Sequence, residues 1–325
     1  MSGRFELFDG KSETFLMCNG LLEQTPEEQA EEQVLLSSAG ALSLLWKDST
    51  NAPRVIAWDS EFERYLDHRI KLIKLARENY LPWNIYKEMG LNWVNGLTMN
   101  QGALGSCAGA AFRNSMGYSD LVNCKMTKSR PTEVGCDIVY ALARGNGRLN
   151  WGSGCNGTPL VKYGTEVGNY WASDMGKYDT RGGNVTQANM NNPAFKARAL
   201  QKQSIIAFYP EITFERFWKV GAAGLFSWIG SSSFPNRATK NSENLSQASS
   251  FTNGAHATTM GSGIELARKY IWWSNQHGNQ YAGGARDRFD TPSDSTWIDN
   301  IDFPRFKINT NYGRPFVHIG EIPCL

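Results

Sequence analysis

The chain has 325 residues, which is long enough for two domains or for one large domain with an extension. Hydrophobic residues make up 41% and charged residues 20% of it, the usual proportions of a globular protein, so a chain that is disordered throughout is excluded. The 33 basic and 31 acidic residues give a net charge of +2 and form no long single-sign run, which excludes a dedicated nucleic-acid-binding protein.

The N-terminal residues, Met1 to Asp9, contain no basic segment followed by an apolar core, and so no Sec signal. The longest apolar stretch nearby, residues 39–46, is interrupted by Gly40 and Ser43 and is far shorter than the roughly 20 apolar residues of a membrane span. We therefore expect a protein that is made in the cytoplasm, is not Sec-secreted and has no membrane partner. Its cysteines are expected to be mostly reduced thiols.

Residues that commonly ligate metals are few and scattered. The six cysteines include no CxxC pair, and only four histidines are present. Because zinc sites need such ligands at characteristic spacings, we expect neither a metal site nor a cofactor.

Residues 1–80 are strongly charged and poor in glycine, and they carry helix signals. Thr25 to Glu28 combines an N-cap threonine, a proline at the first helical position and a glutamate at N3. Apolar residues at helical spacing follow from Leu35 to Trp46, and a second set from Leu66 to Arg77 predicts another helix. We interpret residues 1–80 as an N-terminal helical extension and residues 81–325 as the main domain.

The main domain is rich in glycine turns, aromatic residues and short apolar runs. Its patterns predict helices at residues 107–121, 138–144 and 160–164. They predict strands at residues 224–230, 255–261, 269–275 and 314–319, and polar surface loops at residues 231–252 and 282–296. Helices followed by strands in one block predict an α+β domain with a helical half and a sheet half.

A cysteine lies where a glycine-rich loop meets a predicted helix, in the stretch from Asn100 to Phe112. The N-terminus of a helix stabilises an anion, so this position favours the Cys107 thiolate over the thiol. The side chain of Gln101 and the Cys107 backbone N–H are two donors for the oxyanion of a tetrahedral intermediate. Taken alone, such a cysteine is more often a small buried residue that packs a helix, so a catalytic reading needs a base.

His256 supplies a candidate base, and Asn275 a group to orient it. The histidine lies in a predicted strand, and the asparagine ends the strand that follows. If the two strands are adjacent, the Asn275 carbonyl fixes the imidazole tautomer. His256 follows Cys107 by 149 positions and Asn275 follows it by 168, against about 130–150 in papain-like enzymes. The alternative is that His256 is a structural residue whose ring is hydrogen-bonded within the core.

Four motifs in chain order resemble those of papain-family (C1-type) cysteine peptidases. They are the approach to the nucleophile at residues 82–101, the nucleophile motif ending in Cys107, the glycine-rich segment Gly154 to Pro159, and the base strand and asparagine turn at His256 and Asn275. The match covers about residues 82–280. The resemblance implies a papain-like two-lobed fold, with a helical half and an antiparallel sheet or barrel half, that acts on a polypeptide substrate.

The resemblance also implies the chemistry, which is thiol-dependent hydrolysis of a peptide bond. His256 takes the Cys107 proton, and the thiolate attacks the peptide carbonyl. Gln101 and the Cys107 N–H hold the oxyanion, Asn275 orients the ring, and His256 protonates the leaving amine. The substrate strand would lie beside Asn156, Gly157 and Ala255, although Gly157 is equally readable as an ordinary turn glycine.

Three departures from the family pattern keep other functions open. Leu104 stands where the family has a cysteine, so Cys155 lacks its usual disulfide partner. Ala108 replaces an aromatic residue after the nucleophile, and His277 replaces the tryptophan that shields the His–Asn bond.

Two alternative functions follow, and one alternative role for residues 1–80. The chain would be a structural or assembly subunit of a virus or phage particle, with processing activity reduced or lost, or a cell-wall peptide hydrolase. The second is disfavoured because such hydrolases keep their cysteine and histidine much closer than 149 positions. Residues 1–80 are either an inhibitory pro-region or a docking extension.

Overall fold

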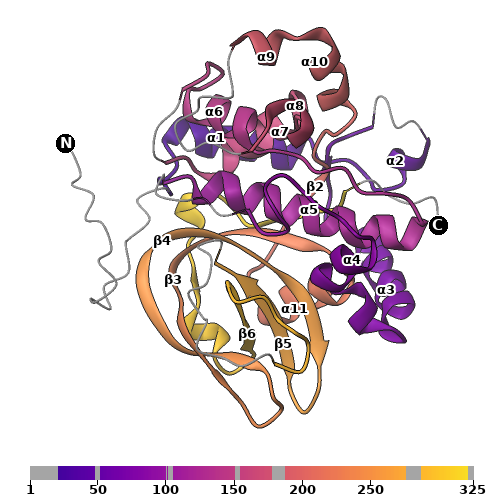
Figure 1. Ribbon diagram of the computed structural model, residues 1–325. Coiled ribbons are helices and arrows are strands. Elements are labelled where there is room, and N and C mark those ends of the chain that lie inside the picture. The colour runs from indigo at the N-terminus through magenta and orange to yellow at the C-terminus, as the bar shows by residue number, and fades with distance from the viewer. Residues whose placement is uncertain are drawn as a thin grey trace.

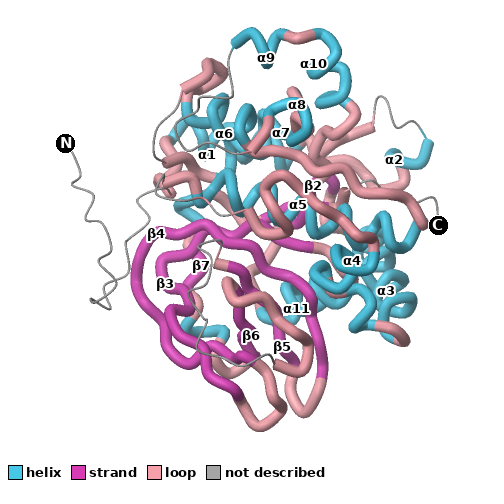
Figure 2. The backbone as a smooth tube through the Cα atoms, in the orientation of Figure 1, coloured by secondary structure: helices cyan, strands magenta, loops and turns pink. Residues whose placement is uncertain are grey.

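The computed structural model describes residues 21–47, 52–99, 101, 105–150, 154–177, 187–275 and 287–320. Helices occupy one half of the molecule and a largely antiparallel sheet the other, with one long helix between them (Figures 1 and 2). The predicted α+β class, with the helical part before the β-rich part, is confirmed. Within the described ranges, no helix is both long and apolar enough to cross a membrane.

The predicted helices are found, but the stretch from Leu35 to Trp46 is divided between α1 and α2, and the structure adds α4 and α8 to α11. The α-helices are α1 (Pro26–Ser37), α2 (Leu44–Lys47), α3 (Ser60–Lys74), α4 (Pro82–Glu88), α5 (Cys107–Thr127), α6 (Asp137–Arg144), α7 (Gly157–Glu166), α8 (Ala172–Met175), α9 (Gln187–Asn191), α10 (Pro193–Leu200) and α11 (Phe214–Ala222). The 3₁₀ turns are η1 (Arg77–Tyr80), η2 (Phe303–Arg305) and η3 (Thr310–Tyr312). Helix α1 begins as predicted, because Thr25 and Glu28 form a capping box.

The strands form one sheet in the order β1-β2-β8-β3-β4-β5-β6, with β7 on β3. Their bounds are β1 (Val55–Ile56), β2 (Ile206–Phe208), β3 (Phe226–Lys240), β4 (Ser246–Glu265), β5 (Lys269–Ser274), β6 (Ser295–Asp299), β7 (Lys307–Ile308) and β8 (Phe316–His318). Neighbours on this path pair antiparallel except β1 and β2.

Strands β3 and β4 form a long hairpin that overturns one prediction. Residues 231–252 were expected to be a surface loop, but Ser231 pairs with His256 and Lys240 with Ser246. The serines and threonines in this segment are compatible with a ladder, because hydroxyl side chains pair well across antiparallel strands. The prediction of a loop was wrong because it rested on the polarity of residues 231–252 alone.

Helix α5 forms the centre of the molecule. Every residue from Cys107 to Asn123 is buried, so the helix is covered on all sides. Small residues allow close packing: a Cβ at Gly109 would lie 2.9 Å from the Tyr140 ring of α6. A helix that is fully covered in this way is fixed in position by its neighbours.

The region before residue 80 contributes to the same core as the sheet. Strand β1 pairs with β2, and Ile56, Phe62 and Leu66 belong to one buried cluster with residues of β3, β5 and α11. Helix α3 packs on α11. Asp59 is the N-cap of α3. Removing this region would expose the core face of the sheet.

Candidate active site

Helix α5 is fixed on strands β3 and β4 at two levels. Near its middle, the Ser119 hydroxyl accepts the N–H of Phe226 at 3.0 Å. About two turns earlier, the Thr259 hydroxyl donates to the carbonyl of Ala111 at 3.1 Å, and Thr259 lies opposite Trp228 in the ladder. Earlier residues of α5 therefore lie beside later residues of β3.

The same direction leads to the two residues predicted to react. The next turn of α5 ends at its first residue, Cys107, and β3 continues from Trp228 to Ser231, which pairs with His256. The Trp228 indole N–H donates to the carbonyl of Ala108 at 3.0 Å and ties the first turn of α5 to this level. The hairpin and the helix thus bring Cys107 and His256 to the same end of their interface.

His256 and Asn275 are in direct contact. The Nε2 atom of His256 lies 2.7 Å from the side-chain oxygen of Asn275 and 3.1 Å from its main-chain carbonyl. Because a main-chain carbonyl can only accept, Nε2 carries the proton. In the neutral ring, Nδ1 is then the nitrogen that accepts a proton.

Burial controls the charge of His256. Its side chain is 1% exposed, and desolvation lowers its pKa to about 4, although the two bonds to Asn275 favour the charged ring. The ring is therefore neutral at pH 7. A neutral imidazole with its proton on Nε2 is the form that can take a proton from a thiol.

Strand β3 shapes the surroundings of His256. The Phe234 ring packs against the imidazole, with ring centroids 4.9 Å apart, and the Ser231 hydroxyl donates to the His256 carbonyl at 3.0 Å. Trp273 lies behind Phe234 and donates its indole N–H to Thr258 at 3.0 Å. His277 lies outside the described residues.

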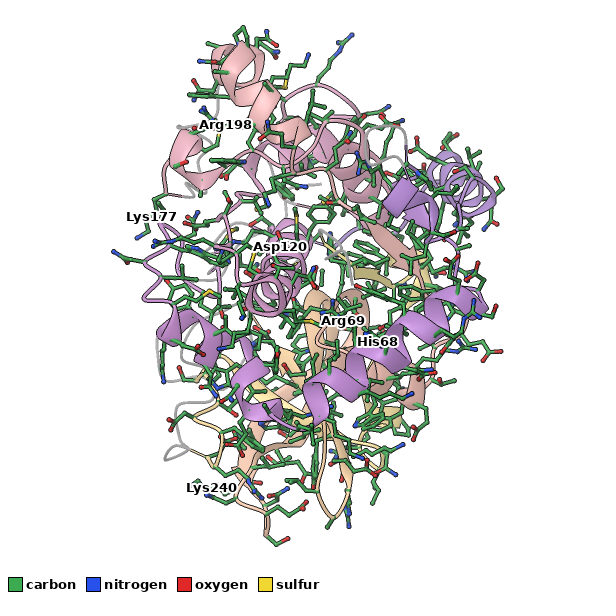
Figure 3. The ribbon with its side chains drawn as sticks, turned by 90° about the vertical axis from the view of Figure 1, so that its right-hand side faces the viewer. His68, Arg69, Asp120, Lys177, Arg198 and Lys240 are labelled. Atoms are coloured by element: carbon green, nitrogen blue, oxygen red, sulfur yellow. The ribbon has the colours of Figure 1, made fainter. Side chains whose placement is uncertain are left out.

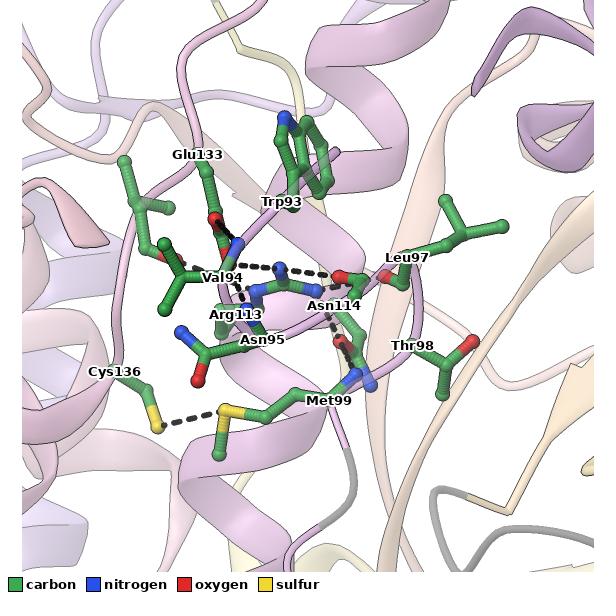
Figure 4. A network of polar contacts seen from close by, with 12 residues as sticks. Trp93, Val94, Asn95, Leu97, Thr98, Met99, Arg113, Asn114, Glu133 and Cys136 are labelled. Atoms are coloured by element: carbon green, nitrogen blue, oxygen red, sulfur yellow. Dashed lines mark hydrogen bonds and ion pairs between the residues drawn. The ribbon is translucent and has the colours of Figure 1, made fainter. Parts of the chain in front are cut away.

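A buried ion pair holds the segment that leads to Gln101 (Figure 4). Arg113 of α5 donates to Glu133 at 3.0 Å, and both side chains are buried. Arg113 also donates to the carbonyl of Leu97 at 2.7 Å, and Glu133 accepts the N–H of Asn95 at 2.8 Å. The two charges are thus compensated by each other and by main-chain groups.

Two further side chains of α5 hold the same segment. Asn114 accepts the N–H of Met99 at 3.0 Å, and the hydroxyls of Tyr118 and Thr98 lie 2.7 Å apart. Gln101, only two residues beyond Met99, is 1% exposed. No motif in the sequence points to these supporting residues; the one available signal is an arginine among the small residues of the helix.

The predicted substrate-binding residues lie at the start of α7 and on β4. Asn156 is the N-cap of α7 and accepts the N–H of Thr158 at 3.2 Å, and Gly157 is the first helical residue. A Cβ at Gly157 would come within 2.7 Å of the Trp228 ring, so glycine permits this close packing. Ala255 is half-buried and packs against the apolar cluster that contains Cys107.

The first described residues of the chain cover the start of α7. The N–H of Leu22 donates to the carbonyl of Cys155 at 3.2 Å. The side-chain amide of Asn156 donates to Glu28 at 2.7 Å. The Cys155 carbonyl and the Asn156 amide are therefore already hydrogen-bonded within the chain. Both lie beside the position expected for a substrate strand.

Helix α1 is anchored to the same place by a second carboxylate. Glu32 is 7% exposed and accepts from the Thr158 hydroxyl at 3.2 Å, from the Gln24 side chain at 3.0 Å and from the N–H of Arg314 at 2.8 Å. Gln24 also donates to the Thr158 hydroxyl at 2.5 Å. One buried carboxylate thus joins α1, α7 and the segment before β8.

The cysteines within the described residues form no disulfide, namely Cys107, Cys124, Cys136 and Cys155. Burial raises the pKa of Cys155 well above its usual value, and the nearby Cys107 and Glu28 raise it further. Cys155 is therefore a neutral thiol next to the predicted nucleophile. Leu104 lies outside the described residues.

No family model and no curated protein matches the chain. Among solved structures, the chain is similar to xylellain, a cysteine protease from Xylella fastidiosa, with a TM-score of 0.46 and 16% identity over 68% of this chain and 81% of that chain. It is similar to proCathepsin B S9 from Trypanosoma congolense, with a TM-score of 0.41 and 10% identity over 72% and 74%. It is also similar to procathepsin L 3 of Tenebrio molitor larval midgut, with a TM-score of 0.40 and 11% identity over 92% and 94%. These three solved structures are papain-like cysteine proteases.

Proposed function

We propose that the chain is a thiol-dependent peptidase that hydrolyses peptide bonds in a polypeptide substrate. The observation that carries the proposal is the pairing of His256 Nε2 with the Asn275 oxygens, at the level of the hairpin where α5 begins with Cys107. This pairing leaves proton acceptance to Nδ1, as a general base for a thiol requires.

The reaction would proceed by acyl transfer. Nδ1 of His256 takes the proton of Cys107, and the sulfur attacks the substrate carbonyl while the N-terminus of α5 stabilises the anion. Gln101 and the Cys107 N–H hold the oxyanion. His256 then returns its proton to the leaving amine, and water hydrolyses the thioester by the reverse sequence.

Substrate access would require the segment around Leu22 to leave the start of α7. Its bond to Cys155 uses main-chain groups at the place where a substrate strand would add. In this proposal the segment is inhibitory, which is one of the two roles that the sequence left open for residues 1–80.

A second candidate is a structural or assembly protein built on the same fold, with its activity reduced or lost. The observation that favours it is burial: Cys107 is 0% exposed, and Gln101, His256 and Asn275 are each 1% exposed. A site with no solvent-exposed group cannot act unless part of the chain moves.

Hydrolysis of a fluorogenic peptide library under reducing conditions separates the two candidates. We expect activity that is lost in Cys107→Ala and falls by at least about 100-fold in His256→Ala, which removes the base. Asn275→Ala should cost less, because it removes only the orienting group. Unchanged activity in His256→Ala would exclude this mechanism, and a wild-type chain without activity, even after the segment is loosened as described below, would favour the structural role.

A further inference from the structure

A cavity of about 360 Å³ lies on the side of the molecule where α3 ends, well away from Cys107. It is open to solvent on one side and is lined by the end of α3, the turn η1, helix α11, the turn between β4 and β5, and residues 288–289. Ile73, at the end of α3, belongs to one buried cluster with Val122 of α5. Val122 is 15 residues, or roughly 22 Å, along the helix from Cys107, so the cavity is separate from the candidate active site.

Two aromatic residues in the wall of this cavity are held in place by hydrogen bonds. Trp218 forms one wall, and its indole N–H donates to the carbonyl of Ile264 at 2.9 Å. Phe289 forms another, and its carbonyl accepts from the indole of Trp83 at 2.7 Å. Ligand sites usually combine apolar walls of this kind with a few polar groups, in volumes from about 300 Å³ upward.

The charged side chains around the cavity leave a positive excess. Arg77 donates to the carbonyl of Gly263 and is attracted to Glu265; burial lowers its pKa to about 10, so it stays charged at pH 7. Lys74 and Arg288 form no ion pair with any residue that the structure describes, and Glu78 is the remaining carboxylate. Three cations against two carboxylates give the lining a net charge of +1.

Lys74 and Arg288 are the lining cations that an anion would meet. Lys74 ends α3 and is exposed, and Arg288 lies over the Phe289 ring with its guanidinium carbon 5.1 Å from the centroid. Both cations line the same cavity as Trp218 and Phe289, so one ligand can meet the aromatic rings and the charges together. An acidic group is stabilised by the cations, while the aromatic walls bury an apolar body.

We propose that this cavity binds a small aromatic carboxylate. The apolar body occupies the space between Trp218 and Phe289, and the carboxylate faces Lys74 and Arg288. The size favours a small molecule, because a space of about 360 Å³ is at the lower end of the range of ligand sites. The proposal does not depend on the peptidase function.

Two probes of the same shape test the role of charge: 2-naphthoate, which is an anion, and 2-naphthamide, which is neutral. We expect isothermal titration calorimetry to give a Kd below about 1 mM for 2-naphthoate and a value at least about tenfold higher for 2-naphthamide. Added salt should raise the Kd of the anion only. The indole N–H resonance of Trp218 should shift on binding, which locates the probe.

Matched variants test the location. The double variant Lys74→Ala/Arg288→Ala should lose most of the preference for 2-naphthoate, whereas Lys87→Ala, an exposed lysine on α4, should keep it. Leu266→Trp, which enlarges a lining residue at the expense of the cavity, should abolish binding of both probes. Equal affinities for the two probes, an unmoved Trp218 resonance, or full preference in the double variant would each overturn the proposal.

Discussion

Arg69 of α3 donates a hydrogen bond of 2.8 Å to the side-chain oxygen of Asn123 of α5, and both residues are buried. Arg69 also donates to the carbonyl of Ala223 at 2.7 Å, and Asn123 donates to the carbonyl of Ile319 at 2.9 Å. These bonds connect the N-terminal region to the helix that begins with Cys107 and to the end of β8. The region before residue 80 is therefore joined to the main domain by polar contacts as well as by its apolar core.

Replacing Arg69 by alanine should destabilise the fold by about 3–5 kcal/mol, because it leaves buried acceptors on Ala223 and Asn123 without their donor. His68→Ala is the matched control, because His68 and Arg69 are neighbours on α3 (Figure 3) and His68 is exposed. Its loss should cost no more than about 0.5 kcal/mol. Urea unfolding measures both. By the same reasoning, a chain that begins at residue 81 should not fold; a cooperative unfolding transition from it would show that the region is dispensable.

Stability should fall as the pH is lowered from about 6.5. Burial lowers the pKa of His318 to about 3 and that of His256 to about 4, whereas both have pKa values near 6.5 when unfolded. Between these values the unfolded chain binds more protons than the folded one, so each histidine costs about 1.4 kcal/mol per pH unit. Above pH 6.5 neither state binds these protons, so this loss of stability is absent.

Melting temperatures across pH 4 to 7 measure this effect. His318→Gln, which keeps a polar partner for the Ser115 hydroxyl now 2.8 Å from the ring, should flatten the dependence. His68→Gln, at an exposed position, should leave it unchanged. An equally steep profile in His318→Gln would show that other groups govern acid unfolding.

Loosening the segment that covers the start of α7 should expose Cys107. Glu32→Ala removes the buried carboxylate that accepts from Gln24, Thr158 and Arg314, so residues 21–28 should leave their place more often. We expect iodoacetamide at pH 6 to label Cys107 several-fold faster in this variant than in the wild type, as followed by peptide mass spectrometry.

Glu31→Ala is the control for that experiment. Glu31 pairs with Lys162 near the surface, and a surface ion pair contributes little to stability. Its loss should leave the labelling rate unchanged. The same rate of Cys107 labelling in Glu32→Ala as in the wild type, or equal labelling of Cys124, would argue against an inhibitory segment.

Gly157 should prove to be a packing requirement. In Gly157→Ala the new Cβ would lie 2.7 Å from the Trp228 ring, and we expect a loss of about 1–3 kcal/mol in urea unfolding. Gly117→Ala is the control, since its Cβ would make an ordinary contact of 3.5 Å with Trp93 and α5 should gain up to about 1 kcal/mol. If Gly157→Ala left the free energy of unfolding unchanged, packing would not explain the glycine, and a role in substrate binding would remain.

Local signals in the sequence predicted several elements well. The capping box at Thr25 and the start of α5 at Cys107 lie where they were expected, because caps and helix starts depend on a few neighbouring residues. The contact between His256 and Asn275 could also be anticipated, since adjacent strands bring the ends of consecutive predicted segments together.

Contacts between distant segments could not be read in the same way. The extension of β3 and β4 through a serine-rich stretch depends on pairing across the hairpin, which polarity conceals. The bond between Leu22 and Cys155 joins residues more than a hundred positions apart, and neither carries a motif for it. The buried pair of Arg113 and Glu133 was equally invisible, because charged residues are usually solvated at a surface.

The segment around Leu22 is continuous with β1 and α3, which are themselves part of the core. If it blocks substrate, it does so as a tethered competitor, with an effective concentration in the millimolar range that dilution does not change. Opening would then be reversible within one chain, and a substrate would succeed by binding more tightly than the segment, without any fragment being released. Mutations that weaken α1 on α7 would raise apparent substrate affinity without touching the groups that react.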